Sequence, residues 1–250
     1  MNRRSDYIAV FDSGVGGISV LRQLLRLMPG ERYIYFGDSA HAPYGTKSTQ
    51  EVRQLSLQVA EKLMGRGLKA LVVACNTATA AAIEELRQTY PELIVVGIEP
   101  ALKLAVDRFP GGTIGVMATP VTLREEKFHQ LCLRFENQCT ILPLPAPGLV
   151  ELVEEGKANS PESRALLEEL LGAYRGKLDA VVLGCTHYPF AAKTISQILE
   201  GRAVLLDGGE GTAAQTRRRL EAADLLHEGP GQIIVENSLE DPAMLALWIS

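Results

Sequence analysis

Two segments of this chain repeat each other, and each leads into a cysteine. One reads Leu68-Lys-Ala-Leu-Val-Val-Ala-Cys75, and the other, 110 residues later, reads Leu178-Asp-Ala-Val-Val-Leu-Gly-Cys185, with four of the eight aligned positions identical. Both are short apolar runs of the length of a buried strand, and a helical pattern follows each. Ile114-Gly-Val also echoes Ile8-Ala-Val at an offset of 106 residues. These matched offsets predict a fold with two similar halves.

Short apolar runs alternate with amphipathic helical patterns along most of the chain, which is typical of α/β proteins with largely parallel sheets. We expect strands over residues 8–11, 32–36, 68–74, 93–98, 113–117 and 178–183. We expect helices over residues 18–28, 49–64, 77–89, 122–135 and 161–174, and a proline-rich link over 143–148. The sequence thus predicts two similar doubly wound α/β lobes, 1–98 and 99–206, with a segment 207–250 that packs back on the first lobe.

Composition narrows the class of protein. The 250 residues carry a formal net charge of −5, so no basic field would attract nucleic acid or an anionic membrane. The longest uncharged stretch, residues 70–83, has fourteen residues, whereas a membrane helix needs about twenty. No signal peptide is visible at the start, and we expect a cytoplasmic protein. None of the four cysteines forms the close pairs that zinc sites use, so we expect no metal.

Polar side chains follow several of the expected strands. In open α/β sheets, ligands bind beyond the carboxyl ends of the strands, where helix N-termini present unpaired amides. The groups at those ends are Asp12-Ser13, Cys75-Asn76-Thr77, Thr119 and Cys185-Thr186-His187. An alternative reading remains open, because Asn, Thr, Asp and Ser are also the usual helix caps.

The two cysteines suit acid/base chemistry at carbon. A thiol with a pKa of about 8.5 is mostly protonated at neutral pH, but a helix N-terminus or a neighbouring imidazole favours the thiolate. If the two halves face each other across a cleft, a thiolate on one wall can remove a proton while a thiol on the other wall donates one. Asp12 could assist Cys75, and His187 could assist Cys185. Packed cysteines and a capping histidine are the competing interpretation.

The chain resembles the cofactor-independent glutamate racemases over nearly its whole length. The motifs that carry the resemblance are Phe11-Asp-Ser-Gly-Val-Gly-Gly17, Phe36-Gly-Asp-Ser-Ala-His-Ala-Pro-Tyr-Gly45, Ala74-Cys-Asn-Thr-Ala78, Gly115-Val-Met-Ala-Thr119 and Gly184-Cys-Thr-His-Tyr-Pro189. The resemblance implies a two-lobed α/β fold with the active site between the lobes, no pyridoxal phosphate or other cofactor, a homodimer, and D-glutamate made for peptidoglycan.

The resemblance also implies roles for particular residues. Cys75 and Cys185 would be proton donor and acceptor on opposite faces of the α-carbon, with Asp12 and His187 assisting them. The substrate would be held by Asp12, Ser13, Tyr44, Gly45, Asn76, Thr77, Thr119, Thr186 and His187. Asp38, Thr122 and Glu154 lie at further family positions. Residues 40–42 read Ala-His-Ala where many members carry an arginine, and the unusual Pro-Ala-Pro-Gly near Glu154 leaves that residue outside the expected core site.

The sequence is also compatible with three functions other than glutamate racemisation. A related racemase for aspartate is the nearest, although such relatives usually carry glutamate at the position of His187. A non-catalytic amino-acid-binding protein and a thiol redox protein are the others, and no Cys-x-x-Cys motif favours the last. The glycines of residues 12–17 lack the spacing of a dinucleotide site. We interpret Cys132 and Cys139 as packing residues and Arg217-Arg218-Arg219 as a solvated helix face.

Overall fold

The computed structural model describes residues 3–98, 101–124 and 126–239. The chain divides into two compact units, one formed by the residues up to Ile98 together with those from Gly209 onward, and the other by the residues between them. The expected lobe boundary at Glu99 lies outside the described residues, as do residues 240–250 of the expected C-terminal segment.

The first unit contains a five-stranded sheet in the order β4-β3-β1-β2-β9, and all of its neighbouring strands are parallel. The strands are β1 (Tyr7–Asp12), β2 (Arg32–Gly37), β3 (Leu68–Val73), β4 (Ile94–Gly97) and β9 (Gln232–Asn237). Parallel strands end at the same edge of the sheet, so Asp12, the last residue of β1, lies at one edge with Asp38 and Cys75, which follow β2 and β3. The last strand, β9, pairs with β2 and thereby ties the C-terminal segment to this sheet.

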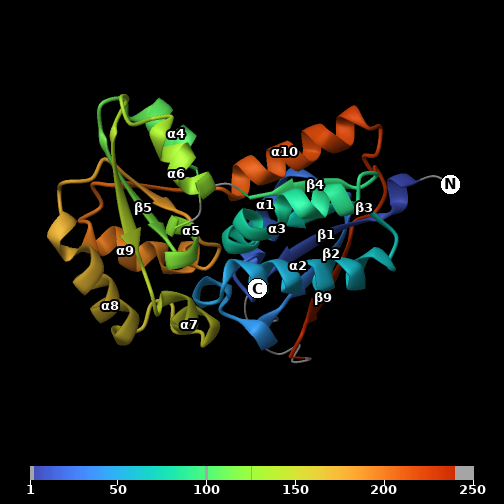
Figure 1. Cartoon of the computed structure of the whole chain (residues 1–250), viewed down its shortest axis with the longest axis horizontal. Coiled ribbons are helices and arrows are strands. Elements are labelled where there is room, and N and C mark those ends of the chain that lie inside the picture. Colours follow the sequence, from blue (N-terminus) through green and yellow to red (C-terminus); the bar gives the residue numbers. More distant parts are fainter. Residues whose placement is uncertain (1–2, 99–100, 125, 240–250) are drawn as a thin grey trace. The chain divides into compact units, whose positions relative to one another are not determined.

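Helices cover both faces of this sheet: α1 (Ile18–Leu27) packs on α10 (Gly209–Ala222), and α2 (Thr49–Met64) packs on α3 (Asn76–Thr89). Figure 1 shows the sheet between these helix pairs. Ala9 and Phe11 of β1 join the hydrophobic core under α2 and α3, while Ile8 and Val10 are buried on the opposite face. Burial on both faces explains why β1 reads as a continuous apolar run.

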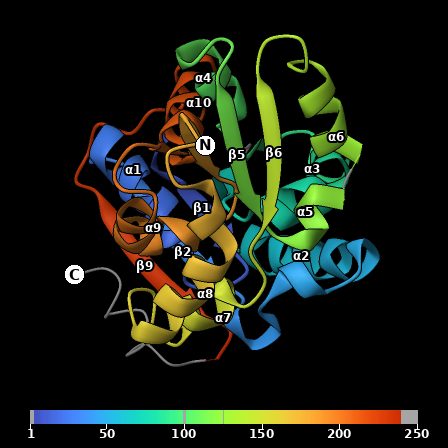
Figure 2. The ribbon, with the colours of Figure 1, turned by 90° about the vertical axis from the view of Figure 1, so that its left-hand side faces the viewer.

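The second unit contains a four-stranded parallel sheet in the order β6-β5-β7-β8. Its strands are β5 (Thr113–Ala118), β6 (Thr140–Pro145), β7 (Ala180–Leu183) and β8 (Val204–Asp207). Figure 2 shows β5 and β6 side by side, with β6 at the edge of the sheet.

Two groups of helices bury the faces of the second sheet. Val181 and Leu183 of β7 pack with residues of α7 (Leu149–Glu154), α8 (Pro161–Leu171) and α9 (Ala192–Ile198). Ala180 and Val182 point to the other face, where they pack with residues of α4 (Leu102–Arg108) and α6 (Glu126–Leu133). The period of two along β7 therefore divides one strand between two cores.

The internal repeat is visible in the strand order. Strands β4-β3-β1-β2 of the first sheet and β8-β7-β5-β6 of the second have the same order when they are matched along the chain, and β9 is an addition to the first sheet. The strands that lead into Cys75 and Cys185, β3 and β7, occupy equivalent positions. The predicted fold class, two similar α/β lobes with parallel sheets, is confirmed.

Several predicted elements match closely. Helix α2 spans the predicted residues 49–64, because the Ser48 hydroxyl accepts a hydrogen bond from the backbone amide of Glu51 and fixes its start. The helix predicted over 122–135 is present as α5 (Pro120–Arg124) and α6, on either side of residue 125. The helix predicted over 161–174 ends earlier as α8 and continues as the 3₁₀ helix Gly172–Tyr174.

The proline-rich link predicted over 143–148 is wrong in its first half. Residues Pro143 and Pro145 belong to β6, which pairs with β5 from Thr140 to Pro145. Proline cannot donate a hydrogen bond to a sheet, but β6 is an edge strand, where one side needs no donor. The prolines therefore mark an edge strand rather than a loop.

The described part of the chain holds no helix that is both long enough and apolar enough to span a membrane.

Candidate functional site

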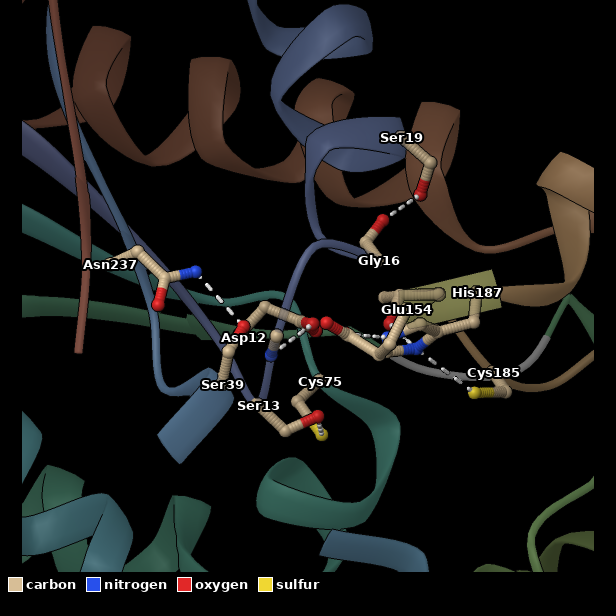
Figure 3. Close-up of polar contacts among 12 residues, drawn as sticks. Asp12, Ser13, Gly16, Ser19, Ser39, Cys75, Glu154, Cys185, His187 and Asn237 are labelled. Atoms are coloured by element: carbon tan, nitrogen blue, oxygen red, sulfur yellow. Dashed lines mark hydrogen bonds and ion pairs between the residues drawn. The ribbon is translucent and has the colours of Figure 1, made fainter. Parts of the chain in front are cut away.

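The first unit presents the Cys75 thiol at the carboxyl end of β3. Cys75 is the N-cap of α3, and its sulfur accepts a hydrogen bond from the backbone amide of Ala78 at 3.4 Å. The thiol also lies 3.5 Å from the hydroxyl of Ser13, which follows β1 (Figure 3). A helix N-terminus favours negative charge, so this position stabilises a thiolate.

Asp12 ends β1 beside this thiol and is fully buried. Its carboxylate accepts a hydrogen bond of 3.1 Å from the backbone amide of Gly14. The glycine-rich turn after Asp12 has a steric cause, because a Cβ at Gly17 would lie 2.5 Å from the Cβ of Asp12. Helix α1 can begin this close to the carboxylate only with glycine at that position.

Tyr44 reaches the same edge of the sheet from the 3₁₀ helix Tyr44–Thr46, where Gly45 is also buried. Its hydroxyl donates a hydrogen bond of 2.7 Å to the carboxylate of Asp38, which follows β2. Burial, followed by the hydrogen bond and charge of Asp38, raises the pKa of Tyr44, and the charges of Cys75 and Asp12 act in the same direction. Tyr44 therefore stays a neutral hydrogen-bond donor among acidic groups.

Asn76 and Thr77 begin α3 directly after the thiol, and both are buried. Among the described residues, no donor reaches the side-chain oxygen of Asn76. A buried acceptor without a donor costs free energy, on the order of 1–3 kcal/mol. An oxygen of this kind can accept a hydrogen bond from a ligand that carries N–H groups.

The second unit presents the Cys185 thiol at the carboxyl end of β7. Cys185 precedes the short 3₁₀ helix Tyr188–Ala191, so no long helix begins at this thiol as one does at Cys75. Its sulfur lies 3.7 Å from Nδ1 of His187, and the hydroxyl of Thr186 lies 3.4 Å from the same nitrogen. The polar neighbour of the Cys185 sulfur is thus the His187 imidazole, whereas that of the Cys75 sulfur is the Ala78 amide of a helix.

Glu154 completes this arrangement from α7. Its carboxylate oxygen lies 2.5 Å from Nε2 of His187, on the far side of the ring from Cys185 (Figure 3). Helix α7 can start after the proline-rich strand because its N-cap, Gly148, takes a left-handed conformation with φ +82°. A carboxylate on one ring nitrogen fixes the tautomer and stabilises the positively charged imidazolium.

Thr119 and Thr122 lie after β5 in the same unit. Their hydroxyl oxygens are 3.1 Å apart, and the Thr119 hydroxyl accepts from the backbone amide of Thr122 at 3.3 Å. Both side chains are buried. The bond from the Thr122 amide to the Thr119 hydroxyl is a helix cap, the alternative role considered above for polar residues at strand ends.

Each predicted site residue lies at or just after the carboxyl end of a strand, or on the loop that follows it. In the first unit these are Asp12, Ser13, Tyr44, Gly45, Cys75, Asn76 and Thr77, and in the second Thr119, Cys185, Thr186 and His187. Glu154 contacts His187 and Asp38 contacts Tyr44, although the sequence leaves both carboxylates outside the expected core site. Glu154 precedes His187 by 33 residues, so their contact has no local pattern. Among the described residues, no group of three or more His, Cys, Asp or Glu side chains is arranged to hold a metal ion.

Comparisons with known proteins show the family of this chain. Residues 8–216 match the family model described as Asp/Glu/Hydantoin racemase. The glutamate racemase of Clostridium acetobutylicum is 48% identical over 250 aligned residues, which cover 99% of this chain and 97% of that protein.

Two solved structures show the same likeness. Glutamate racemase from Thermus thermophilus, in complex with β-chloro-D-alanine, has a TM-score of 0.83 at 36% identity and covers 98% of this chain and 92% of its own. Escherichia coli glutamate racemase, in complex with L-glutamate and the activator UDP-MurNAc-ala, has a TM-score of 0.84 at 34% identity and covers 96% and 92%. On the strength of the match over residues 8–216 and of these relatives, the chain belongs to the Asp/Glu/hydantoin racemase family of enzymes.

Proposed function

We propose that this chain is a glutamate racemase that interconverts L- and D-glutamate with Cys75 and Cys185 as its two acid/base groups. One observation carries the proposal: the two parallel sheets have the same strand order, and the equivalent strands β3 and β7 each lead into a buried thiol. The relatives named glutamate racemase support glutamate as the substrate. The proposal requires the two thiols to act on opposite faces of the α-carbon.

In one direction, the thiolate of one cysteine removes the α-proton and the thiol of the other delivers a proton to the opposite face. The two roles exchange in the reverse direction. The Cys75 sulfur accepts a hydrogen bond from the Ala78 amide, and the Cys185 sulfur lies near a ring nitrogen of His187 that can exchange a proton with it. These contacts support the proposal that both cysteines act as acid/base groups.

The hard step is the formation of a carbanion beside a carboxylate. Fixed N–H and O–H dipoles directed at the substrate carboxylate stabilise the developing charge best when water is excluded. The groups that we propose for this purpose are the hydroxyls and amides of Ser13, Tyr44, Gly45, Thr77, Thr119 and Thr186. The Asn76 oxygen and the Asp12 carboxylate suit the substrate ammonium, which supplies the donors that Asn76 lacks within the protein. Every step uses side chains of this chain, so the proposal needs no cofactor.

The biological setting is part of the same proposal. We infer that the D-glutamate serves peptidoglycan synthesis in a bacterial cytoplasm and that the enzyme works as a homodimer. The bacterial relatives support the first inference. Rescue of a D-glutamate-requiring bacterial strain by this chain would test the first, and analytical ultracentrifugation would test the second.

The direct test of function uses heavy water. Purified protein, with no added pyridoxal phosphate, is incubated with D-glutamate in deuterium oxide, and circular dichroism and α-deuterium content are followed. A two-base racemase places solvent deuterium in the L-glutamate product, while the remaining D-glutamate stays protiated early in the reaction. A one-base enzyme would return deuterium to both enantiomers.

The outcomes separate the remaining functions. The family model spans racemases for aspartate, glutamate and hydantoins, so aspartate is run in parallel. If the protein racemises aspartate but not glutamate, the proposed substrate is wrong. Folded protein that racemises neither amino acid but binds glutamate would instead favour a binding protein.

A further inference from the structure

The carboxylate of Asp38 is held by two side chains of the loop that follows β2. Asp38 has a side-chain exposure of 4%. One oxygen accepts from the Tyr44 hydroxyl at 2.7 Å, and both oxygens lie near Nδ1 of His41, at 2.9 and 3.0 Å. Among the described residues, His41 is the only basic side chain in contact with this carboxylate.

This contact matters because a buried carboxylate is costly without a partner. The Tyr44 hydroxyl supplies a hydrogen bond but no positive charge. The His41 imidazole is half exposed, and its Nδ1 lies within hydrogen-bond distance of both oxygens of the Asp38 carboxylate. Asp38 therefore has His41 as its basic partner and the Tyr44 hydroxyl as its second hydrogen-bond partner.

We propose that His41 is a positioning residue: it holds the Asp38 carboxylate on the Tyr44 hydroxyl and thereby fixes the segment that presents Tyr44 and Gly45 to the substrate. This inference rests on the proposed function, because it assumes that Tyr44 and Gly45 bind glutamate. Histidine and arginine can both donate to a carboxylate and carry positive charge, so arginine is the conservative replacement at this position.

The backbone of the same loop is anchored independently of His41. The amide of Ala40 donates to the Ser238 hydroxyl at 2.8 Å, and the side-chain amide of Asn237 donates to the Ser39 hydroxyl at 2.9 Å (Figure 3). Asn237 and Ser238 lie at the end of β9. Removal of the His41 imidazole therefore leaves the loop attached to the sheet and acts mainly on Asp38.

The expected consequence is a defect in substrate binding. Without His41, Asp38 is a buried carboxylate with no basic partner, close to the proposed site of a substrate that itself carries two carboxylates. His41→Ala should raise KM for glutamate about tenfold, the size of one charged hydrogen bond, with a smaller effect on kcat. His41→Arg, which keeps a cationic donor, should restore KM to within about threefold of the wild type.

A double-mutant cycle shows whether His41 acts through Asp38. In an Asp38→Asn background there is no carboxylate to compensate, so His41→Ala should change KM less than twofold. His129→Ala, which removes an exposed histidine from α6, is the matched control and should behave as the wild type. Thermal unfolding of every variant checks that the loop change has not unfolded the protein.

Two results would overturn the inference while the proposed function stands: wild-type KM in His41→Ala, or the same loss from His41→Ala with and without the Asp38 carboxylate. If the wild-type protein does not racemise glutamate at all, the proposed function fails and takes this inference with it. A raised KM that arginine rescues and that Asp38→Asn suppresses supports it.

Discussion

At the scale of single residues, one imidazole lies between a thiol and a carboxylate, an arrangement that suits proton transfer. His187 is 1% exposed, with the Cys185 sulfur near one ring nitrogen and the Glu154 oxygen near the other. Proton transfer from the thiol would leave an imidazolium, and the Glu154 carboxylate stabilises that charge. In the proposed mechanism, Glu154 would therefore act through His187 as a positioning residue.

Replacement of Glu154 by glutamine should lower kcat/KM for glutamate about tenfold or more, because the amide can hold the ring but cannot stabilise its positive charge. The loss must be equal in both directions, since the enantiomers have equal free energy. Initial rates from L- and D-glutamate measure it. Glu155→Gln, a change at the exposed neighbouring position, is the control and should leave the rates unchanged.

Isotope effects identify the step that Glu154 serves. With α-deuterated substrate, the primary isotope effect in Glu154→Gln should rise for the enantiomer whose proton Cys185 removes and should fall for the other. Equal changes for both enantiomers would contradict a role confined to Cys185.

At the scale of elements, a buried ion pair ties the segment between α10 and β9 to the first sheet. Lys69, at the start of β3, has its ammonium 2.5 Å from Glu31 and also donates to the backbone oxygens of Arg4 and Leu225. Glu31 accepts in turn from the backbone amide of His227. The pair lies at the amino-terminal end of β3, whereas Cys75 follows the carboxyl end.

Lys69→Met should therefore lower the free energy of unfolding by about 3–5 kcal/mol, because it leaves the Glu31 carboxylate buried without a positive partner. Folded Lys69→Met should keep the wild-type kcat/KM, since the change lies at the other end of the strand. Urea unfolding and initial rates measure the two quantities. Lys177→Met, at an exposed position, should change stability by no more than about 0.5 kcal/mol. A large loss of activity in folded Lys69→Met would show that the two ends are coupled.

Elements with strong local signals could be predicted from the sequence, and elements defined by their neighbours could not. Helix α2 has a serine cap and a regular apolar stripe, and its predicted limits are the observed ones. Strand β6 contains two prolines, has no regular strand pattern of its own, and pairs with β5 at the edge of the sheet. Strands β8 and β9 lie in stretches for which we predicted no strand, and each pairs along one edge of its sheet. The Glu154–His187 contact is likewise tertiary, so the sequence reveals the two residues without their pairing.

At the scale of the whole molecule, three buried tyrosines link stability to alkaline pH. Burial is the largest cause that raises the pKa of Tyr33, Tyr44 and Tyr188 above the ordinary value. Each hydroxyl is hydrogen-bonded inside its own unit, Tyr33 to backbone oxygens of Leu24 and Met28 among them. The unfolded chain ionises these groups from about pH 10 upward, whereas the folded protein resists ionisation.

The free energy of unfolding should thus be unaffected by these tyrosines below about pH 9 and should fall as pH rises above about 10. Each tyrosine contributes a slope of about 1.4 kcal/mol per pH unit in that range. Urea unfolding between pH 8 and 11 measures the slope. Tyr33→Phe removes one ionising group and should make the slope shallower by about 1.4 kcal/mol per pH unit. An unchanged slope in that variant would show that Tyr33 does not contribute.

The internal repeat is also a property of the whole molecule. It could be predicted because both copies keep a similar apolar strand sequence before the cysteine. What surrounds each thiol differs: Cys75 lies at the start of a 14-residue helix, whereas Cys185 relies on a histidine. The sequence predicted His187 as the partner of Cys185 and placed Asp12-Ser13 and Cys75 at strand ends of the same lobe, but it did not indicate the direct contact between Ser13 and Cys75, which are 62 residues apart.

The measurement that tests the two-thiol account most directly is racemisation by the single variants Cys75→Ala and Cys185→Ala. Both variants should lose racemase activity in each direction while they keep the wild-type far-ultraviolet circular dichroism. Cys132→Ala, which removes a thiol outside the site, should retain full activity. Full activity in either Cys75→Ala or Cys185→Ala would contradict the account, because a two-base mechanism cannot work with one of its bases removed.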